Sequence, residues 1–191
     1  ALGDPTEAAL ITLTAKGCLA PDGLRRDWPR RAEIPFDSGP KMMATQHGHT
    51  HQPNRIFIKG APEAVLELCS RARAGNEVRP LDDGLRQQAL TAAEGLASQA
   101  LRCLAVAEAD GTELDEAAGF AQFKGRTTLL GIIGQMDPPR EEVKAAVAEC
   151  RAAGIRPVMV TGDHKVTGLA IARTLGIARD GDLAVDGNEL E

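Results

Sequence analysis

A strand that ends in lysine and glycine and runs directly into a helix is the feature that most constrains this chain. Residues 55–63 read Arg-Ile-Phe-Ile-Lys-Gly-Ala-Pro-Glu, and the three apolar residues predict a buried strand. Pro62 suits the first turn of a helix, where its missing N–H is not needed. Lys59 supplies charge, Gly60 lets a ligand approach the backbone, and the helix start offers free N–H groups, so the turn suits an anion. On this stretch alone, a plain turn with a solvated lysine is the simpler explanation.

Composition limits the classes of protein to consider. The chain has 191 residues, 43% of them hydrophobic, which is enough for one large or two small domains. Its net charge of -5 argues against nucleic acid as a partner, because such binding needs clustered basic residues. The four cysteines are widely spaced and form no CxxC, as expected of small core residues in a reducing compartment. No apolar run approaches about 18 residues, the length of a membrane span.

The residues up to about 135 predict strands and helices in an α/β arrangement. The chain opens already at a helix start, which suggests a fragment of something longer, and Gly17 closes that first helix. The polar stretch 46–54 predicts a hairpin loop between antiparallel strands. The expected strands are 31–36, the strand from Lys41, 55–58, 101–107 and 128–134, and the further helices are Pro62–Arg73, followed by a loop to Asp83, and Leu85–Ala100.

The sequence pattern changes at Pro138-Pro139. Paired prolines after a predicted strand indicate a hinge or domain boundary. We therefore expect two domains, residues 1–135 and 136–191. In the second, the pattern predicts a helix over 140–153, a buried strand over 157–160, a helix from Asp163 to Leu175 and a short strand at 183–185. Alternation of strands and helices predicts a parallel sheet, whose ligands bind beyond the carboxyl ends of the strands. Thr161 and Asp163 stand at such an end.

Several single residues allow both a functional and a structural explanation. Thr161-Gly162-Asp163 suits phosphate with Mg²⁺, but Asp163 could simply cap its helix. Glu7 fits a capping box with Asp4. Phe36 could be a core residue or an exposed platform for a base, and Arg102 could pair with phosphate or with a surface carboxylate.

The run His47-Gly48-His49-Thr50-His51 places three imidazoles close together. No Cys, Asp or Glu lies nearby, so a solvated loop explains it better than a metal site. The sequence contains no GxxxxGK[ST] phosphate loop, GxGxxG, GxSxG or HExxH motif.

Seven short motifs, taken in order, resemble the cytoplasmic part of P-type cation-transporting ATPases, in particular the calcium-pump-like branch. They are Gly3-Asp4-Pro5-Thr6-Glu7, Pro35-Phe36-Asp37-Ser38 with Lys41, Lys59-Gly60-Ala61-Pro62-Glu63, Leu101-Arg102-Cys103-Leu104-Ala105, Met136-Asp137-Pro138-Pro139-Arg140, Ala153-Gly154-Ile155-Arg156 and Met159-Val160-Thr161-Gly162-Asp163. The resemblance covers nearly the whole chain. It implies a nucleotide-binding domain with an antiparallel sheet flanked by helices, followed by part of a haloacid-dehalogenase-like phosphorylation domain.

The resemblance also implies a role for each matching residue, with ATP as the ligand and Mg²⁺ as its companion ion. The nucleotide-binding residues would be Glu7 near the adenine, Phe36 stacked on it, Lys41 and Lys59 along the base and the phosphate path, Gly60 shaping the pocket and Arg102 near the phosphates. Asp137 and Arg140 would lie at the hinge. Thr161, Gly162 and Asp163 would face the phosphorylated aspartate in the parent protein.

The family's Asp-Lys-Thr-Gly-Thr run, which carries the phosphorylated aspartate, does not occur in the chain, and neither does its later Gly-Asp-Gly-x-Asn-Asp run. We therefore expect a piece at the cytoplasmic face of a membrane that binds ATP but does not phosphorylate itself, with an incomplete Mg²⁺ site. Its partners would be the rest of the pump, namely the missing phosphorylation-domain segments, the actuator domain and the transmembrane helices. The incomplete second sheet could also pair with another copy. The competing hypotheses are a haloacid-dehalogenase-like phosphohydrolase and a non-enzymatic nucleotide- or metal-binding module.

Overall fold

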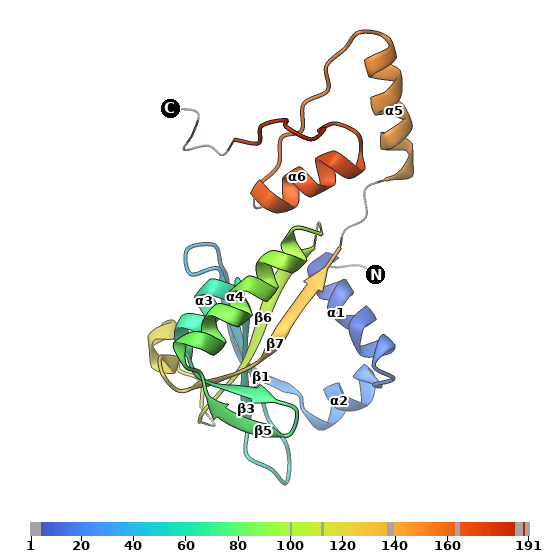
Figure 1. Cartoon of the computed structure of the whole chain (residues 1–191). Coiled ribbons are helices and arrows are strands. Elements are labelled where there is room, and N and C mark those ends of the chain that lie inside the picture. The colour runs from blue at the N-terminus through green and yellow to red at the C-terminus, as the bar shows by residue number, and fades with distance from the viewer. Residues whose placement is uncertain are drawn as a thin grey trace. The chain divides into compact units, whose positions relative to one another are not determined.

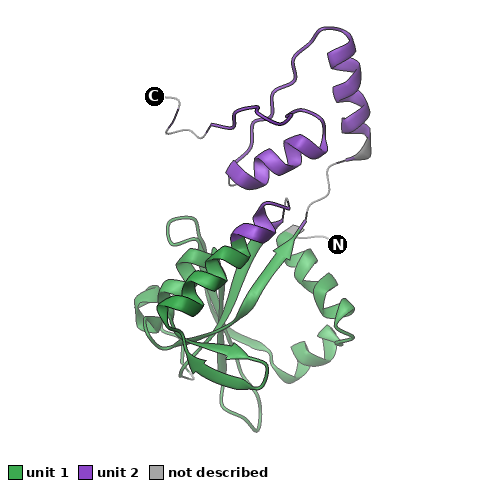
Figure 2. Ribbon diagram, in the orientation of Figure 1, with its two compact units in different colours: residues 1–93, 103–135 green, residues 94–102, 136–191 purple. Residues whose placement is uncertain are grey.

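The computed structural model describes residues 5–99, 101–111, 113–136, 140–162, 165–185 and 189. They form two compact units, residues 1–93 with 103–135 and residues 94–102 with 136–191 (Figure 2). The first unit contains a seven-stranded sheet with helices packed on it (Figure 1). None of the helices in the described ranges is long and apolar enough to cross a membrane.

The sheet has the strand order β1-β2-β3-β6-β7-β4-β5. Its strands are β1 (Arg30–Asp37), β2 (Met42–His47), β3 (Arg55–Gly60), β4 (Cys69–Ala74), β5 (Glu77–Pro80), β6 (Arg102–Ala109) and β7 (Thr127–Gln135). The antiparallel pairs β1–β2, β2–β3 and β3–β6 agree with the sequence expectation. The sheet is nevertheless mixed, because β4 pairs with β7 in the parallel direction.

The two faces of the sheet differ in burial, as the alternation of side chains along a strand requires. The even-numbered positions of β2 and β3 are buried, and Ala44, Ile56 and Ile58 have no exposed surface. They pack with α3 (Pro62–Leu68) and with Leu85 and Ala89 of α4 (Asp83–Ala97). The odd-numbered positions are half-buried, except Arg55, which is exposed. The helices α1 (Pro5–Lys16) and α2 (Pro21–Asp27) lie on the side of the sheet away from α3 and α4 (Figure 1).

The predicted helix over 62–73 is wrong in its second half. The helix ends at Leu68, Cys69 already has extended backbone angles, and β4 and β5 form a hairpin in place of the predicted loop. Gly75, with φ +62°, makes the turn between them. Since β4 pairs with β7, more than 50 residues away, the pairing that overrides the helical pattern is invisible to local periodicity. Helix α2 and the short 3-10 helix η1 (Gly119–Phe123) were also not predicted.

The second unit contains the expected helices α5 (Glu141–Ala152) and α6 (Lys165–Thr174). Gly154 and Gly176 end them with φ near +77° and +75°, as the sequence indicated. The guanidinium of Arg151 donates to the carbonyl of Ile177 at 3.0 Å, which ties the end of α5 to the segment after α6.

The two strands predicted in this unit are absent from the described residues. Val158 and Val160 are 76% and 93% exposed, and Leu183 is 93% exposed. A strand needs a neighbour for its backbone N–H and C=O groups, and no strand among the described residues of this unit supplies one. The haloacid-dehalogenase-like parallel sheet expected from the resemblance is therefore not confirmed.

Candidate functional site

The end of β3 can be built only with glycine at position 60. A Cβ on Gly60 would collide with the backbone oxygen of Lys41 and would lie 2.8 Å from the Cα of Met42. That same Lys41 oxygen accepts a hydrogen bond from the N–H of Ala61 at 3.0 Å. Lys41 itself has φ +55°, a conformation uncommon for residues other than glycine. The close approach of these two segments fixes where β3 ends and where α3 begins.

Lys59 and Glu7 form an ion pair across this end of the sheet. The Nζ of Lys59 donates to Oε1 of Glu7, which lies in the first turn of α1. The Lys59 side chain is 21% exposed and that of Glu7 is 50% exposed. The sequence predicted that both residues serve one site, and the structure brings them together. The other explanation for Glu7, a capping box with Asp4, depends on a residue outside the described ranges.

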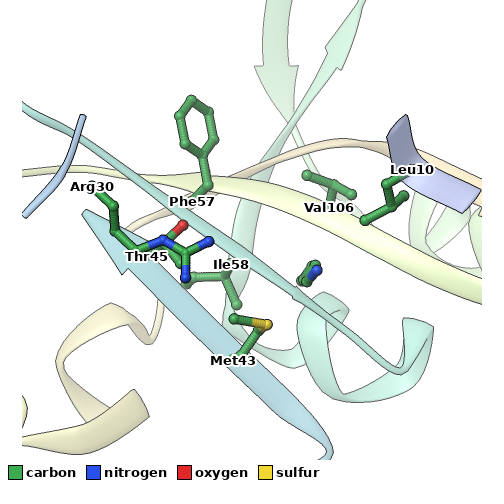
Figure 3. Close-up of a pocket in the computed structure, with 8 residues that line it drawn as sticks. Leu10, Arg30, Met43, Thr45, Phe57, Ile58 and Val106 are labelled. Atoms are coloured by element: carbon green, nitrogen blue, oxygen red, sulfur yellow. The ribbon is translucent and has the colours of Figure 1, made fainter. Parts of the chain in front are cut away.

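A cavity of about 160 Å³ opens beside this ion pair, between α1 and the half-buried face of the sheet. The residues that line it are Leu10, Arg30, Met43, Thr45, Phe57, Ile58, Lys59 and Val106, as drawn in Figure 3. The sheet explains why they meet. Met43 lies opposite Lys59, Lys59 lies opposite Val106, and Thr45 lies opposite Phe57 in the strand register. The lining is mainly apolar with a few polar groups, the composition typical of sites for small organic ligands.

Phe57 is held from two sides by other rings and charges. The guanidinium of Arg55 lies 5.0 Å from the centre of the Phe57 ring, and the His47 ring lies 6.0 Å away. Arg55 in turn donates to Glu108 at 2.7 Å. This hydrogen bond, with the charge of Glu108, raises the pKa of Arg55 against the lowering effect of its burial. The aromatic part of the cavity lining therefore has a cation and a second ring as its neighbours.

Phe36 is an exposed aromatic side chain and not a core residue. It is 59% exposed and lies in a stretch of β1 where the register shifts between Ile34 and Asp37. Such irregularities turn a side chain away from the regular alternation of the strand. The exposed-platform explanation agrees with this position. Neither Phe36 nor the exposed side chain of Lys41 is among the residues that line the cavity.

The remaining predicted residues do not line the cavity. Arg102 is exposed at the start of β6 and belongs to the second compact unit. Arg140 is exposed at the N-cap of α5, and Thr161 and Gly162 are exposed before α6. Asp137 and Asp163 lie outside the described residues.

The three histidines do not form a metal site. Within the described ranges, no group of three His, Cys, Asp or Glu side chains could hold a metal ion. His47 lies on β2, where its Nδ1 is 3.1 Å from the backbone oxygen of Trp28 and its Nε2 is 3.0 Å from the hydroxyl of Thr45. Nδ1 of His49 accepts from the N–H of His51 at 3.0 Å, and its ring lies 4.7 Å from that of Trp28.

Comparison with known proteins decides the family. A model of the P-type ATPase cytoplasmic domain N matches residues 1–142. The chain is 36% identical over 190 residues to calcium-transporting ATPase 1 of Lactococcus lactis, 38% identical over 195 residues to a calcium-transporting ATPase of Listeria monocytogenes, and 37% identical over 191 residues to calcium-transporting ATPase 1 of Bacillus cereus. These matches cover 99–100% of this chain. The chain belongs to the P-type ATPase family.

The P-type ATPase relatives are much longer than this chain, which spans 21% of the length of each of them. The family model covers the whole sheet, β1 to β7, and the cavity on it. The matches to the relatives continue through the second unit, with α5 and α6.

Sequence reasoning missed most of the residues that line this cavity of the P-type ATPase domain. Met43, Thr45, Phe57 and Val106 were treated only as parts of strands, although Lys59 was singled out. The alternation of side chains between the two faces of a strand could have identified them. Phe57 is two residues from Lys59 and so shares its face. Given the hairpin, Thr45 and Met43 follow as cross-strand neighbours of Phe57 and Lys59.

Proposed function

We propose that this chain binds ATP in the cavity between α1 and the sheet, as the nucleotide-binding part of a P-type ATPase that drives cation transport across a membrane. The observation that carries the proposal is the Lys59–Glu7 ion pair at the edge of a mainly apolar cavity. The cavity offers apolar surfaces for a flat base, and Lys59 offers a cation at its edge. The calcium-transporting relatives favour calcium as the transported ion of the whole protein.

Three predicted residues that do not line the cavity, Phe36, Lys41 and Arg102, would also contribute to nucleotide binding. Phe36 is available for stacking on the adenine because its ring is 59% exposed. Lys41 and Arg102 are exposed cations, which suits contacts with the base or with the phosphates. Gly60 keeps the strand end tight against Lys41. Glu7 shares Lys59 with the incoming ligand, so ATP binding would rearrange the ion pair.

Phosphoryl transfer in the whole protein would take place elsewhere. Thr161, Gly162 and Asp163 would face the phosphorylated aspartate, and Asp137 and Arg140 would serve as a hinge between the domains 1–135 and 136–191. Among the described residues, no group of three His, Cys, Asp or Glu side chains could hold a metal ion. We assign no step to Mg²⁺ in this chain. The chain would work at the cytoplasmic face of the membrane, with the actuator domain and the transmembrane helices of the same pump as its partners.

Calorimetric titration of the chain with ATP tests the proposal. Lys59→Met removes the ammonium group but keeps a long apolar side chain, so it should weaken ATP binding about tenfold, the effect of one lost contact to a charged group. Lys124→Met is the matched control, since Lys124 is exposed and does not line the cavity. ATP affinity unchanged in Lys59→Met, or lost equally in both variants, would contradict the proposal.

A further inference from the structure

Thr45 differs from every other side chain of the cavity in its hydrogen-bonding capacity. The described residues that line the cavity include three with strongly polar side chains, Arg30, Thr45 and Lys59. Arginine and lysine side chains only donate hydrogen bonds. Arg30 already donates to Glu33 at 2.6 Å, and Lys59 donates to Glu7. The hydroxyl of Thr45 is therefore the one strong side-chain acceptor of the cavity lining.

His47 fixes the direction in which the Thr45 hydroxyl points. Nδ1 of His47 is 3.1 Å from the backbone oxygen of Trp28, and a carbonyl oxygen can only accept. Nδ1 must therefore carry the proton. In the neutral imidazole the other nitrogen, Nε2, is then an acceptor, so the Thr45 hydroxyl donates to it over 3.0 Å.

This chain of hydrogen bonds leaves Thr45 with lone pairs and no free proton. The order is Thr45 O–H to His47 Nε2, then His47 Nδ1–H to the Trp28 oxygen. A ligand atom that meets Thr45 must donate. A ligand that presents an acceptor at the same place would meet only lone pairs, and would have given up its hydrogen bond to water.

We propose that Thr45, held by His47, makes the cavity select a 6-aminopurine nucleotide over a 6-oxopurine nucleotide. The inference rests on the proposed function, since it assumes that a purine base occupies the cavity. The 6-amino group of adenine donates hydrogen bonds, so Thr45 can accept from it. The 6-oxygen of hypoxanthine or guanine only accepts, so Thr45 leaves it without a partner. His47 is a positioning residue here, because it acts only through Thr45.

The test compares ATP with inosine 5′-triphosphate, which keeps the ribose and phosphates and carries an oxygen where adenine carries the 6-amino group. Binding to the full chain is measured by calorimetry. We expect a preference for ATP of about tenfold, as one unpaired neutral group allows. Thr45→Val keeps the shape but removes the hydroxyl, and should reduce the preference to about twofold. Thr45→Ser keeps the hydroxyl and should preserve it.

His47→Phe provides the readout that separates positioning from simple packing. It keeps a ring beside Phe57 but gives the Thr45 hydroxyl no acceptor, so the hydroxyl becomes free to donate. We expect it to retain nucleotide binding but to lose the preference for ATP. Thermal melting followed by circular dichroism confirms that each variant is folded before its affinities are compared.

The outcomes distinguish the role proposed for Thr45 from the proposed ATP site itself. Equal binding of ATP and inosine triphosphate by the unmodified chain would overturn the role of Thr45 and leave the proposed ATP site standing. An unchanged preference in folded Thr45→Val would overturn it as well, and an unchanged preference in His47→Phe would overturn the positioning role of His47. If neither nucleotide binds, both the inference and the proposed function are wrong.

Discussion

Lys59 at the end of β3 donates a hydrogen bond to Glu7 in the first turn of α1. The two residues are separated by 52 positions in the sequence, so the contact is a property of the fold. It is also the only described ion pair that joins α1 to the sheet. The pair stands beside the cavity in which we place the nucleotide.

The ion pair should matter little for stability. Glu7→Gln should lower the free energy of unfolding by less than about 1 kcal/mol, because half of the Glu7 side chain is exposed and water screens the charge. Urea denaturation followed by circular dichroism measures this. If Glu7→Gln lowers the free energy of unfolding by more than about 2 kcal/mol, the ion pair behaves as a buried one. Affinities measured for Glu7 or Lys59 variants would then have to be corrected for the unfolded fraction.

Gly60→Ala should be strongly destabilising, because the new Cβ meets the backbone at Lys41 and Met42 and not a movable side chain. We expect a loss of about 1–3 kcal/mol or more in the free energy of unfolding, the usual range for overpacking. Gly95→Ala is the control. Gly95 lies within α4 with nothing within 4 Å of a Cβ, so that substitution should stabilise by about 0.5–1 kcal/mol. If Gly60→Ala and Gly95→Ala change the free energy of unfolding equally, the close approach of Gly60 to the backbone at Lys41 and Met42 is contradicted.

The thiols should differ in reactivity with their burial. Burial raises the pKa of Cys69 and of Cys103, while the nearby Thr127 hydroxyl and the charge of Arg86 oppose the rise at Cys69. A raised pKa means less thiolate at neutral pH, and the thiolate is the reactive form. Iodoacetamide should therefore modify the exposed Cys18 first, while Cys103 reacts slowly and faster as the pH rises. Peptide mass spectrometry measures this order, and early modification of buried Cys69 would contradict the described core.

The second unit should be less protected than the sheet. Ile56 and Ile58 have no exposed surface, whereas Val160 is 93% exposed and takes part in no described strand. We expect the amides of residues 157–160 to exchange at least about a hundredfold faster than those of β3, because local opening of such a segment requires little free energy. Hydrogen exchange followed by mass spectrometry measures both. Equal protection in a monomer would mean that residues 157–160 have hydrogen-bond partners after all.

Local pattern was sufficient wherever an element is stabilised by its own neighbours in the sequence. The strand ending at Lys59-Gly60, the hairpin around residues 48–54 and the glycine-terminated helices α5 and α6 all follow from nearby residues. The local sequence pattern gave a wrong prediction where a strand pairs with a segment far away in the sequence. The helical spacing of apolar residues from Val65 to Cys69 led to a helix predicted as far as Arg73, but residues 69–74 form a strand because β7 offers them a parallel partner.

The opposite failure occurred at residues 157–160. These four residues have the composition of a buried strand, yet Val158 and Val160 are exposed and Pro157 and Met159 are only half-buried. The described part of the second unit contains no strand to pair with them. Composition thus gives a preference for strand, but pairing decides whether a strand forms.

The candidate site was only partly predictable for a similar reason. Lys59 and Gly60 could be singled out because charge and glycine follow a strand directly. Thr45 and His47 carry no such local signal. Their importance lies in hydrogen bonds to each other and to the backbone of Trp28, 19 residues before His47, and these become visible only when β2 lies in the sheet.

The most direct test of the ATP site is a titration of the isotope-labelled chain with ATP, followed by amide chemical shifts. We predict that the largest shifts fall on the lining of the cavity and the end of β3, at Thr45, Phe57, Lys59 and Gly60, with little change at Gly75 in the hairpin between β4 and β5. If ATP at millimolar concentration leaves these four amides unchanged, or shifts the β4–β5 hairpin instead, the cavity is not the nucleotide site.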